Sequence, residues 1–470
     1  MRKRVEKDYL GKKNIPADSY YGIQTERALE NFSISYIKPH SEFIKSTALI
    51  KLAAAKANMI AGLLDSKRGN AIARASQEVV DGKLHHYFVV DVFQAGAGTS
   101  HNMNANEVIA NRAIEILGGK KGDYKIIDPH DHVNKSQSTN DTYPTTMRIT
   151  CLSLTEYLLK ELEGLVKSFN TKAKQFDNVI KSGRTHLMDA APIRLGQEFK
   201  AYADMLAKDK ENILSASKKL LELNIGATAI GTGLNADPRY VSEMIKNLSK
   251  LTGFKLYRAK DLVEITQSME DFVVFSSVLK ALAIDLTKIC NDIRLMGSGP
   301  TAGLAEIKIP AVQPGSSIMP GKINPSIAEC MNMICYQIMG NDSTITLAAQ
   351  AGQFELNVMM PLIAYNLIFS LQIMKNGLKM LREKLVDGIQ ANREWMKFIA
   401  EKSYGIAMAL NPYLGYNKTA ELVKIAMKKH KTLREIVLEK KLMTKEELDK
   451  ILDVYALTEM GIAGKRKVRK

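Results

Sequence analysis

The chain has 470 residues, of which 46% are hydrophobic and 25% charged, with a formal net charge of +16. This length exceeds the size at which one hydrophobic core keeps growing, so we expect two or three domains. No stretch approaches the ~20 unbroken apolar residues of a membrane-spanning helix, and the charged start, residues 1–8, lacks the apolar region of a signal peptide. We therefore expect a soluble, cytoplasmic protein with no membrane partner.

The positive charge is typical either of nucleic-acid binding or of attraction for a small anion. Lysines are interspersed with acids, as in Lys208-Asp209-Lys210-Glu211, and no basic stripe alternates with aromatic residues, so we expect no nucleic-acid partner. The basic tail, residues 464–470, is interpreted as a solvated end. The cysteines lack metal-ligand spacing and each lies in an apolar run, which predicts buried free thiols at Cys151, Cys290, Cys330 and Cys335.

Taken in chain order, the first segment opens with polar turns at residues 11–16. Ala, Leu and Ile at helical spacing predict a helix over residues 44–63. Arg27 lies between these features, and a guanidinium fork matches a carboxylate, so it is a candidate carboxylate clamp. The alternative is an ordinary structural ion pair.

Residues 94–107 place two glycines before Thr99 and Ser100, and a predicted helix follows over residues 108–117. A Gly-rich loop that leads into a helix start can bind an anion, because free N–H groups and the helix dipole point the same way. The GxGxxG pattern of a dinucleotide site is missing. Helix capping by Thr and Asn is the alternative explanation.

Residues 130–146 are dense in hydroxyl and amide groups. Uncharged donors at Ser138, Thr139 and Asn140 suit the binding of a carboxylate without neutralising a nearby base. His130 and His132, two residues apart and without further ligands, are poor evidence for a metal, and we expect no metal site. A polar helix cap is the alternative here as well.

From residue 147 onward the pattern predicts long helices, with breaks at residues 180–192 and 226–238. Apolar residues at steps of three and four predict bundle helices over 263–296 and 363–385. Several faces of these helices are apolar, which indicates packing against other copies of the chain. The first break holds Thr185 and His186, which could bind a carboxylate or relay a proton, or could be structural.

Residues 315–325, Gly-Ser-Ser-Ile-Met-Pro-Gly-Lys-Ile-Asn-Pro, predict a shaped loop, because Gly and Pro both constrain the backbone. Its backbone N–H groups and four polar side chains form a donor-rich segment suited to an anion: Ser316, Ser317, Lys322 and Asn324. A solvated turn is the alternative, but a purely solvated turn would not need Ile318 and Met319. Beyond it, an apolar run predicts a helix from residue 327.

This loop resembles the signature loop of the aspartase/fumarase superfamily, whose members eliminate ammonia, water or an amine to leave fumarate. The segments around residues 5–32, 94–107, 138–140, 226–235 and 298–307 are similar to the same superfamily. The resemblance implies a mostly helical, three-domain subunit, with an N-terminal domain (1–140), a central long-helix bundle (141–390) and a small C-terminal helical domain (391–470). It also implies a homotetramer with a multi-helix core and active sites shared between subunits.

Details of these segments favour the aspartase branch, which converts L-aspartate reversibly to fumarate and ammonia. The resemblance implies that Ser316, which the residues alone do not distinguish from Ser317, is the general base, with Lys322 and His186 also catalytic. It implies substrate binding by Thr99, Ser138, Thr139, Asn140, Thr185, Ser317 and Asn324. It also supports the role of Arg27 as a carboxylate clamp. No cofactor is implied, and an activating divalent cation is left open. The chain departs from the family pattern at Met188, Thr301 and Met360.

Two alternatives remain at this point. A class II fumarase, which hydrates fumarate to malate, shares most of the motifs. A catalytically silent scaffold or nucleic-acid binder would use the positive charge and would show salt-sensitive binding without turnover.

Overall fold

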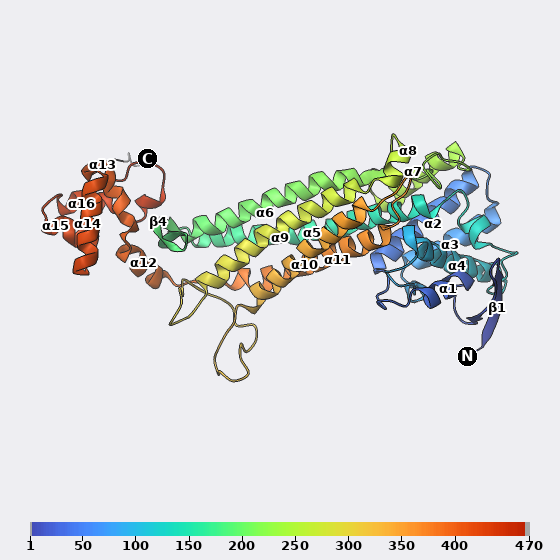
Figure 1. The fold of residues 1–470 in the computed structure, drawn as a ribbon, viewed down its shortest axis with the longest axis horizontal. Coiled ribbons are helices and arrows are strands. Elements are labelled where there is room, and N and C mark those ends of the chain that lie inside the picture. The colour runs from blue at the N-terminus through green and yellow to red at the C-terminus, as the bar shows by residue number, and fades with distance from the viewer. Residues whose placement is uncertain (1, 466–470) are drawn as a thin grey trace. The chain divides into compact units, whose positions relative to one another are not determined.

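The structure is a computed structural model that describes residues 2–465, so most of the basic tail lies outside the described residues. It is mostly helical, as predicted (Figure 1). Contacts divide the chain into two compact units, each assembled from separate segments. The first unit holds residues 1–160, 209–283 and 334–375, and the second holds 161–208, 284–333 and 376–470. The division into 1–140, 141–390 and 391–470 stays a prediction.

The first segment forms a β-hairpin, where the sequence predicted only polar turns. Strands β1 (Lys3–Asp8) and β2 (Gly11–Pro16) pair antiparallel. Only Glu6 and Ile15 of the hairpin are buried, while the remaining side chains are exposed or half-buried. The prediction was wrong because a strand with so little buried surface shows no apolar alternation.

The first unit contains a helical core. Its helices are α1 (Ile23–Asn31), α2 (Ser41–Ile60), α3 (Ser66–Val80), α4 (Thr99–Ile116) and α7 (Pro238–Thr252). Helix α2 confirms the predicted helix, and it begins earlier because His40 Nδ1 accepts a 3.1 Å hydrogen bond from the N–H of Glu42. Helices α3 and α7 both pack against α2, which buries α2 on most of its circumference.

Five long helices each run from one unit into the other: α5 (Thr139–Gln175), α6 (Leu195–Ser217), α9 (Glu270–Met296), α10 (Ser326–Gln350) and α11 (Met360–Lys384). They confirm the predicted bundle helices (Figure 1). Helix α5 includes Pro144, which has no N–H for the carbonyl of Asn140. The side chain of Asn224 donates to that carbonyl at 3.0 Å instead, so the helix continues.

The predicted helix over residues 263–296 is divided into α8 (Leu262–Gln267) and α9. Ser268 adopts an extended conformation between them, and its hydroxyl accepts a 3.3 Å hydrogen bond from the N–H of Glu270. The prediction missed this interruption because apolar residues keep helical spacing across it.

The break at residues 180–192 is a second β-hairpin that the sequence did not reveal. Strands β3 (Ile180–Thr185) and β4 (Met188–Arg194) pair antiparallel, and their two-residue turn has positive φ at His186 and Leu187. Short pairings elsewhere join β5 (Glu222–Leu223) to β6 (Tyr257–Arg258) and β7 (Ile307–Lys308) to β8 (Gln390–Ala391).

The C-terminal part of the second unit has its own apolar core, which includes Leu410, Leu422 and Leu448. Its helices are short: α12 (Arg393–Lys402), α13 (Asn411–Leu414), α14 (Tyr416–Lys429), α15 (Leu433–Glu439) and α16 (Lys445–Ile451).

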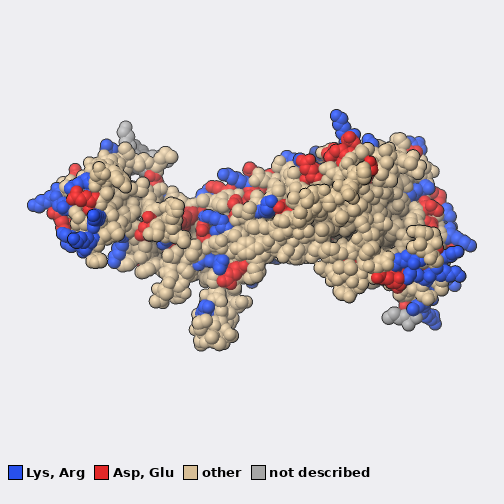
Figure 2. Space-filling view, in the orientation of Figure 1, with Lys and Arg blue, Asp and Glu red and all other residues tan. Residues whose placement is uncertain are grey.

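All four cysteines are free thiols; Cys330 is half-buried and the others are buried. Across residues 2–465, no helix is long and apolar enough to cross a membrane. Basic and acidic side chains lie interspersed on the face drawn in Figure 2.

Candidate active site

The predicted site residues are divided between the two units. The first unit carries Arg27, Thr99 and residues 138–140, and the second carries the hairpin tip at 185–186 and the loop 315–325.

Thr99 is the first residue of α4, and its side chain is exposed. Gly98 precedes it with φ +88°, and a Cβ at this position would lie 2.1 Å from the ring of Tyr143, so only glycine fits. Gly98, the residue before the helix, has no side chain to cap it, and Gln94 satisfies the N–H of His101 alone. The helix dipole therefore favours an anion beside Thr99.

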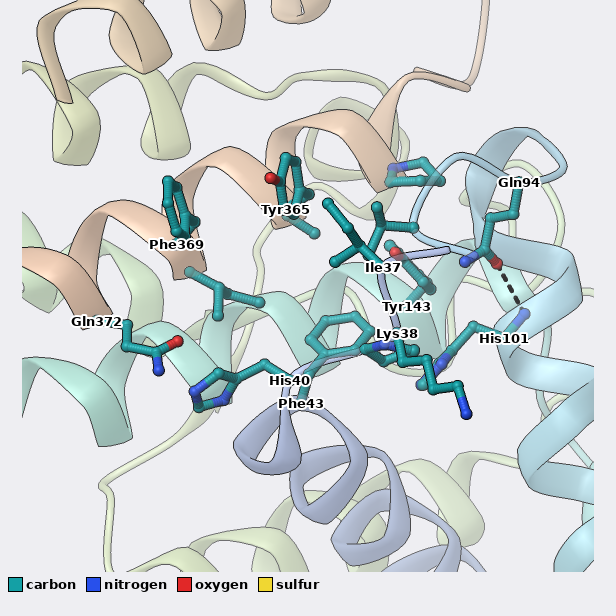
Figure 3. A pocket seen from close by; sticks show the side chains of 15 residues that line it. Ile37, Lys38, His40, Phe43, Gln94, His101, Tyr143, Tyr365, Phe369 and Gln372 are labelled. Atoms are coloured by element: carbon teal, nitrogen blue, oxygen red, sulfur yellow. Dashed lines mark hydrogen bonds between the residues drawn. The ribbon is translucent and has the colours of Figure 1, made fainter. Parts of the chain in front are cut away.

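The first turn of α4 is held by Gln94, whose Oε1 accepts a 2.8 Å hydrogen bond from the N–H of His101 (Figure 3). A mostly apolar pocket of about 130 Å³ adjoins this bond, lined by aromatic side chains that include Phe43 and Tyr365. His101 is fully buried there, and burial lowers its pKa to about 3. This histidine is therefore a neutral part of the helix support.

Helix α5 begins at Thr139, so a second long helix presents its N-terminus in the first unit. The hydroxyl oxygen of Ser138 accepts a 3.2 Å hydrogen bond from the N–H of Asn140, the cap that the sequence left as an alternative. Asn140 Nδ2 donates to the carbonyl of Ala229 at 2.7 Å, which ties the helix start to the loop at 226–233. Thr139 Oγ1 accepts a 3.0 Å hydrogen bond from Nδ2 of Asn102.

A fully buried lysine lies beneath Thr139, and the sequence analysis missed it. Lys51 Nζ donates to Asn102 Oδ1 at 2.8 Å, to Gln137 Oε1 at 3.0 Å and to Asn134 Oδ1 at 3.1 Å. Burial lowers the pKa of Lys51 to about 7. One lysine inside the apolar run Ile50-Lys51-Leu52-Ala53 is the signal that could have revealed it.

Asp141 is also fully buried beside this helix start. Its carboxylate accepts hydrogen bonds from the N–H of Ser138 at 3.0 Å and from the N–H of Thr228 at 3.1 Å. Burial raises its pKa to about 7. Asp141 therefore fixes the backbone that carries Ser138 against the 226–233 loop.

Arg27 forms a bidentate pair with Asp8, with Nε and Nη2 each 2.7 Å from a carboxylate oxygen. The hydrogen bond from Arg27 lowers the pKa of Asp8. This is the structural ion pair that the sequence left as the alternative. Substrate binding by Arg27 stays a prediction.

In the second unit, Thr185 and His186 are exposed at the tip of the β3–β4 hairpin. The base of the hairpin is anchored by Lys181, whose Nζ lies 3.0 Å from Glu198 and 2.9 Å from Glu306. Arg184 also contacts Glu306, at 2.8 Å. The tip is thus presented on a supported strand pair.

The loop 315–325 connects toward α10 as a long irregular segment (Figure 1). The N–H of Gly315 donates to the carbonyl of Lys322 at 2.8 Å, and Asn324 Nδ2 donates to the carbonyl of Gly315 at 2.6 Å. A Cβ on Gly315 would lie 2.5 Å from that Lys322 oxygen, so this closure requires glycine. The loop is therefore a shaped segment, as predicted.

The structure distinguishes the two serines of this loop. Ser316 Oγ accepts hydrogen bonds from the N–H of Met319 at 3.0 Å and of Ile318 at 3.2 Å. Two donors aimed at one hydroxyl oxygen favour its anionic form. Ser317 is exposed, and the described residues provide it with no such pair of donors.

Lys322 and Asn324 line a cavity of about 990 Å³ within the second unit, together with Arg294. The lysine and arginine give this cavity a positive lining that suits a carboxylate.

No group of His, Cys, Asp and Glu side chains among residues 2–465 could hold a metal ion. His132 Nδ1 instead accepts a 2.8 Å hydrogen bond from the N–H of Asp128. Of the departures from the family pattern, Met360 is buried, and Met188 and Thr301 are exposed.

Comparison with known proteins gives matches along nearly the whole chain. Residues 11–340 match a family described as lyase, and residues 406–459 match one described as fumarase C C-terminus. An aspartate ammonia-lyase from Bacillus subtilis (strain 168) is 52% identical over 467 residues, which cover 99% of this chain and 98% of that protein.

Two solved structures have the same fold. A fumarate lyase:delta crystallin from Brucella melitensis, bound to cobalt, superposes with a TM-score of 0.95 at 46% identity, covering 98% of this chain and 100% of that chain. A class II fumarase from Schistosoma mansoni superposes with a TM-score of 0.94 at 36% identity, covering 97% of this chain and 99% of that chain. The chain therefore belongs to the lyase family of the aspartase/fumarase superfamily.

Proposed function

We propose that the protein is a carbon–nitrogen lyase that converts L-aspartate reversibly into fumarate and ammonia. The observation that carries this proposal is the pair of backbone N–H groups directed at Ser316 Oγ, in a loop that also supplies Lys322. This arrangement equips a serine to act as a base. The choice of L-aspartate is supported by the 52% identity to an aspartate ammonia-lyase over nearly the full chain.

The reaction begins with removal of a proton from the β-carbon of L-aspartate. A serine hydroxyl is a poor base at its ordinary acidity, so its anion needs stabilisation. In this proposal the N–H groups of Ile318 and Met319 and the ammonium of Lys322 supply that stabilisation. The anion of Ser316 takes the proton, and the electron pair of the C–H bond moves into the adjacent carboxylate.

The resulting enediolate carries its charge on carboxylate oxygens, and preorganised donors lower its energy. In other enzymes, loss of one such donor costs about 3 kcal/mol of transition-state stabilisation. We assign this role to Thr185, His186 and Asn324. The carbon–nitrogen bond then breaks with its electron pair on nitrogen, so the –NH3⁺ group leaves as ammonia and fumarate remains.

Substrate carboxylate and amino groups are assigned to the first-unit residues, Thr99, Ser138, Thr139 and Asn140, and to Ser317 of the loop. Support for this comes from the N-termini of α4 and α5, because the dipole of each helix favours a negative charge there. No cofactor enters the reaction as written. We place the reaction in the cytoplasm.

We further propose a homotetramer in which each active site takes residues from several subunits. Helix α10 exposes a stripe of large apolar side chains, with Met333 65%, Tyr336 55% and Leu347 62% exposed. Ile318, in the loop itself, is 84% exposed. Such surfaces on a bundle helix and a catalytic loop need a partner, and further copies of the same chain are the simplest one.

The test is the ultraviolet absorbance of fumarate released from L-aspartate and, separately, from L-malate. Fumarate from L-aspartate alone is expected. Fumarate from L-malate alone would show that the protein is a fumarase. Turnover of neither compound would indicate another amine-bearing succinate as the substrate. Salt-sensitive nucleic-acid binding without turnover would favour a scaffold.

A further inference from the structure

Lys51 is the feature of this molecule that the proposed reaction leaves unexplained. Its side chain has no exposed surface, yet it lies one layer beneath Thr139, a residue assigned to the substrate. We propose that Lys51 is a positioning residue, whose ammonium orients Asn102 so that the hydroxyl of Thr139 donates its hydrogen to a substrate carboxylate. This inference rests on the proposed function and adds a residue to its binding site.

The first step is the orientation of the Asn102 amide. A lysine ammonium donates hydrogen bonds and cannot accept them. Lys51 Nζ lies 2.8 Å from Asn102, so the amide must turn its oxygen toward the lysine. Its Nδ2 then points the other way, where it donates to Thr139 Oγ1 at 3.0 Å and to Asn134 Oδ1 at 3.2 Å.

The second step is the direction of the Thr139 hydroxyl. Its oxygen already accepts from Asn102, so its one hydrogen is left for another acceptor. Thr139 is half-buried at the start of α5, where a carboxylate is also favoured by the helix dipole. If the amide were reversed, its oxygen would draw the hydroxyl hydrogen inward, and a substrate would meet only lone pairs.

The neighbouring amides support the charged form of Lys51. Three side-chain oxygens surround Nζ, which matches the three N–H groups of an ammonium. Gln137 is fixed with its oxygen toward Lys51, because its Nε2 donates to the carbonyls of Val133 at 3.0 Å and Lys135 at 3.1 Å. Burial favours the neutral amine and Asp141 favours the ammonium, while His101, the other titratable neighbour, is neutral.

A purely structural role is the competing explanation, because the same contacts join α2 to α4 and to the segment before α5. Lys172 provides the matched control. It is also a buried lysine, and its Nζ donates to the carbonyl of Ile389 at 2.8 Å in the second unit, with no link to Thr139. Replacing either lysine by methionine removes a buried charge. Only Lys51→Met removes the ammonium that holds Asn102 Oδ1, which leaves the hydrogen bond to Asn134 as a remaining constraint on that amide.

The experiment compares Lys51→Met, Lys172→Met and the unaltered enzyme as full-length assemblies. We expect Lys51→Met to raise the KM for L-aspartate about tenfold, the usual effect of losing one hydrogen bond to a charged group, while Lys172→Met lowers thermal stability without raising KM. Thr139→Val alone should raise KM similarly, and adding Lys51→Met to it should cause little further change. An equal rise in both lysine variants, or full additivity with Thr139→Val, would overturn the inference.

A second variant guards against misfolding of Lys51→Met. Asn102→Asp keeps an oxygen for Lys51 but places another oxygen against Thr139, so the hydroxyl turns inward and KM should rise in a folded assembly. Calorimetric binding of fumarate tests the same step without turnover. If fumarate binds but no ammonia is released, the proposed function fails; if Asn102→Asp binds fumarate with unchanged affinity, the Lys51 inference fails.

Discussion

The Oγ atom of Ser316 lies 3.0 Å from the backbone nitrogen of Met319, in a geometry where the hydroxyl oxygen accepts and the N–H donates. The next residue, Ser317, has the same side chain in the same loop and is exposed. A base must lose its proton readily, and a pair of fixed N–H dipoles makes this easier at one serine than at the other. The backbone of the loop therefore distinguishes two serines that the sequence presents as equals.

Replacing Ser316 by alanine tests this distinction directly. We expect kcat for the deamination of L-aspartate to fall by about 10²–10⁴-fold, the usual contribution of a general base, with the assembly intact. Ser317→Ala is the comparison variant: because Ser317 is assigned to substrate binding and not to proton removal, it should raise KM and leave kcat largely unchanged. Equal losses in the two variants, or an active Ser316→Ala enzyme, would contradict the assignment.

Mixed assemblies test whether active sites are shared between subunits. One chain carries Ser316→Ala, and the other carries Thr99→Val together with Thr139→Val. If these residues meet across subunit boundaries, co-expression creates some sites with no altered residue, and kcat/KM should exceed the mean of the two parent assemblies. Activity equal to that mean would place every residue of a site on one chain.

The exposed stripe on α10 predicts a surface that is buried in the assembly. Tyr336 is 55% exposed in the single chain, and a charge there should break the association because an unpaired buried carboxylate costs several kcal/mol. Tyr336→Asp is therefore expected to give smaller species in size-exclusion chromatography and to lose activity with them. Met427→Asp, at a methionine of α14 that is 56% exposed, is the control. A Tyr336→Asp tetramer with normal activity would contradict the proposed interface.

The long helices were predictable because they bury apolar residues at a regular spacing. Helices α10 and α11 occupy the segments in which the sequence shows that spacing. The two β-hairpins were not predictable in the same way. Most side chains of residues 3–16 and 180–194 are not fully buried, so their strands depend on backbone pairing rather than on an apolar face.

The site was predictable only where its residues are adjacent in sequence. Ser316, Lys322 and Asn324 share one loop, and their residue types alone indicate an anion site. Lys51 was missed because its partners, Asn102, Asn134 and Gln137, lie 51, 83 and 86 residues further along the chain. A contact of that kind exists only after α2, α4 and the start of α5 have packed together.

The pKa of His101 predicts how stability depends on pH. Burial lowers this pKa from 6.5 to about 3, so below pH 6.5 the unfolded chain binds a proton that the folded chain does not. The free energy of unfolding should therefore decrease as the pH falls from 6.5 toward 3; at pH 5 the loss is about 2 kcal/mol per subunit from this residue. His101→Phe removes the titrating group and keeps a ring beside Phe43 and Tyr143. Between about pH 7 and about pH 5, we expect the midpoint temperature of thermal unfolding to fall by fewer degrees in the variant than in the unaltered protein. Parallel losses in the two proteins would show that His101 is protonated in the folded state or that another group controls acid stability.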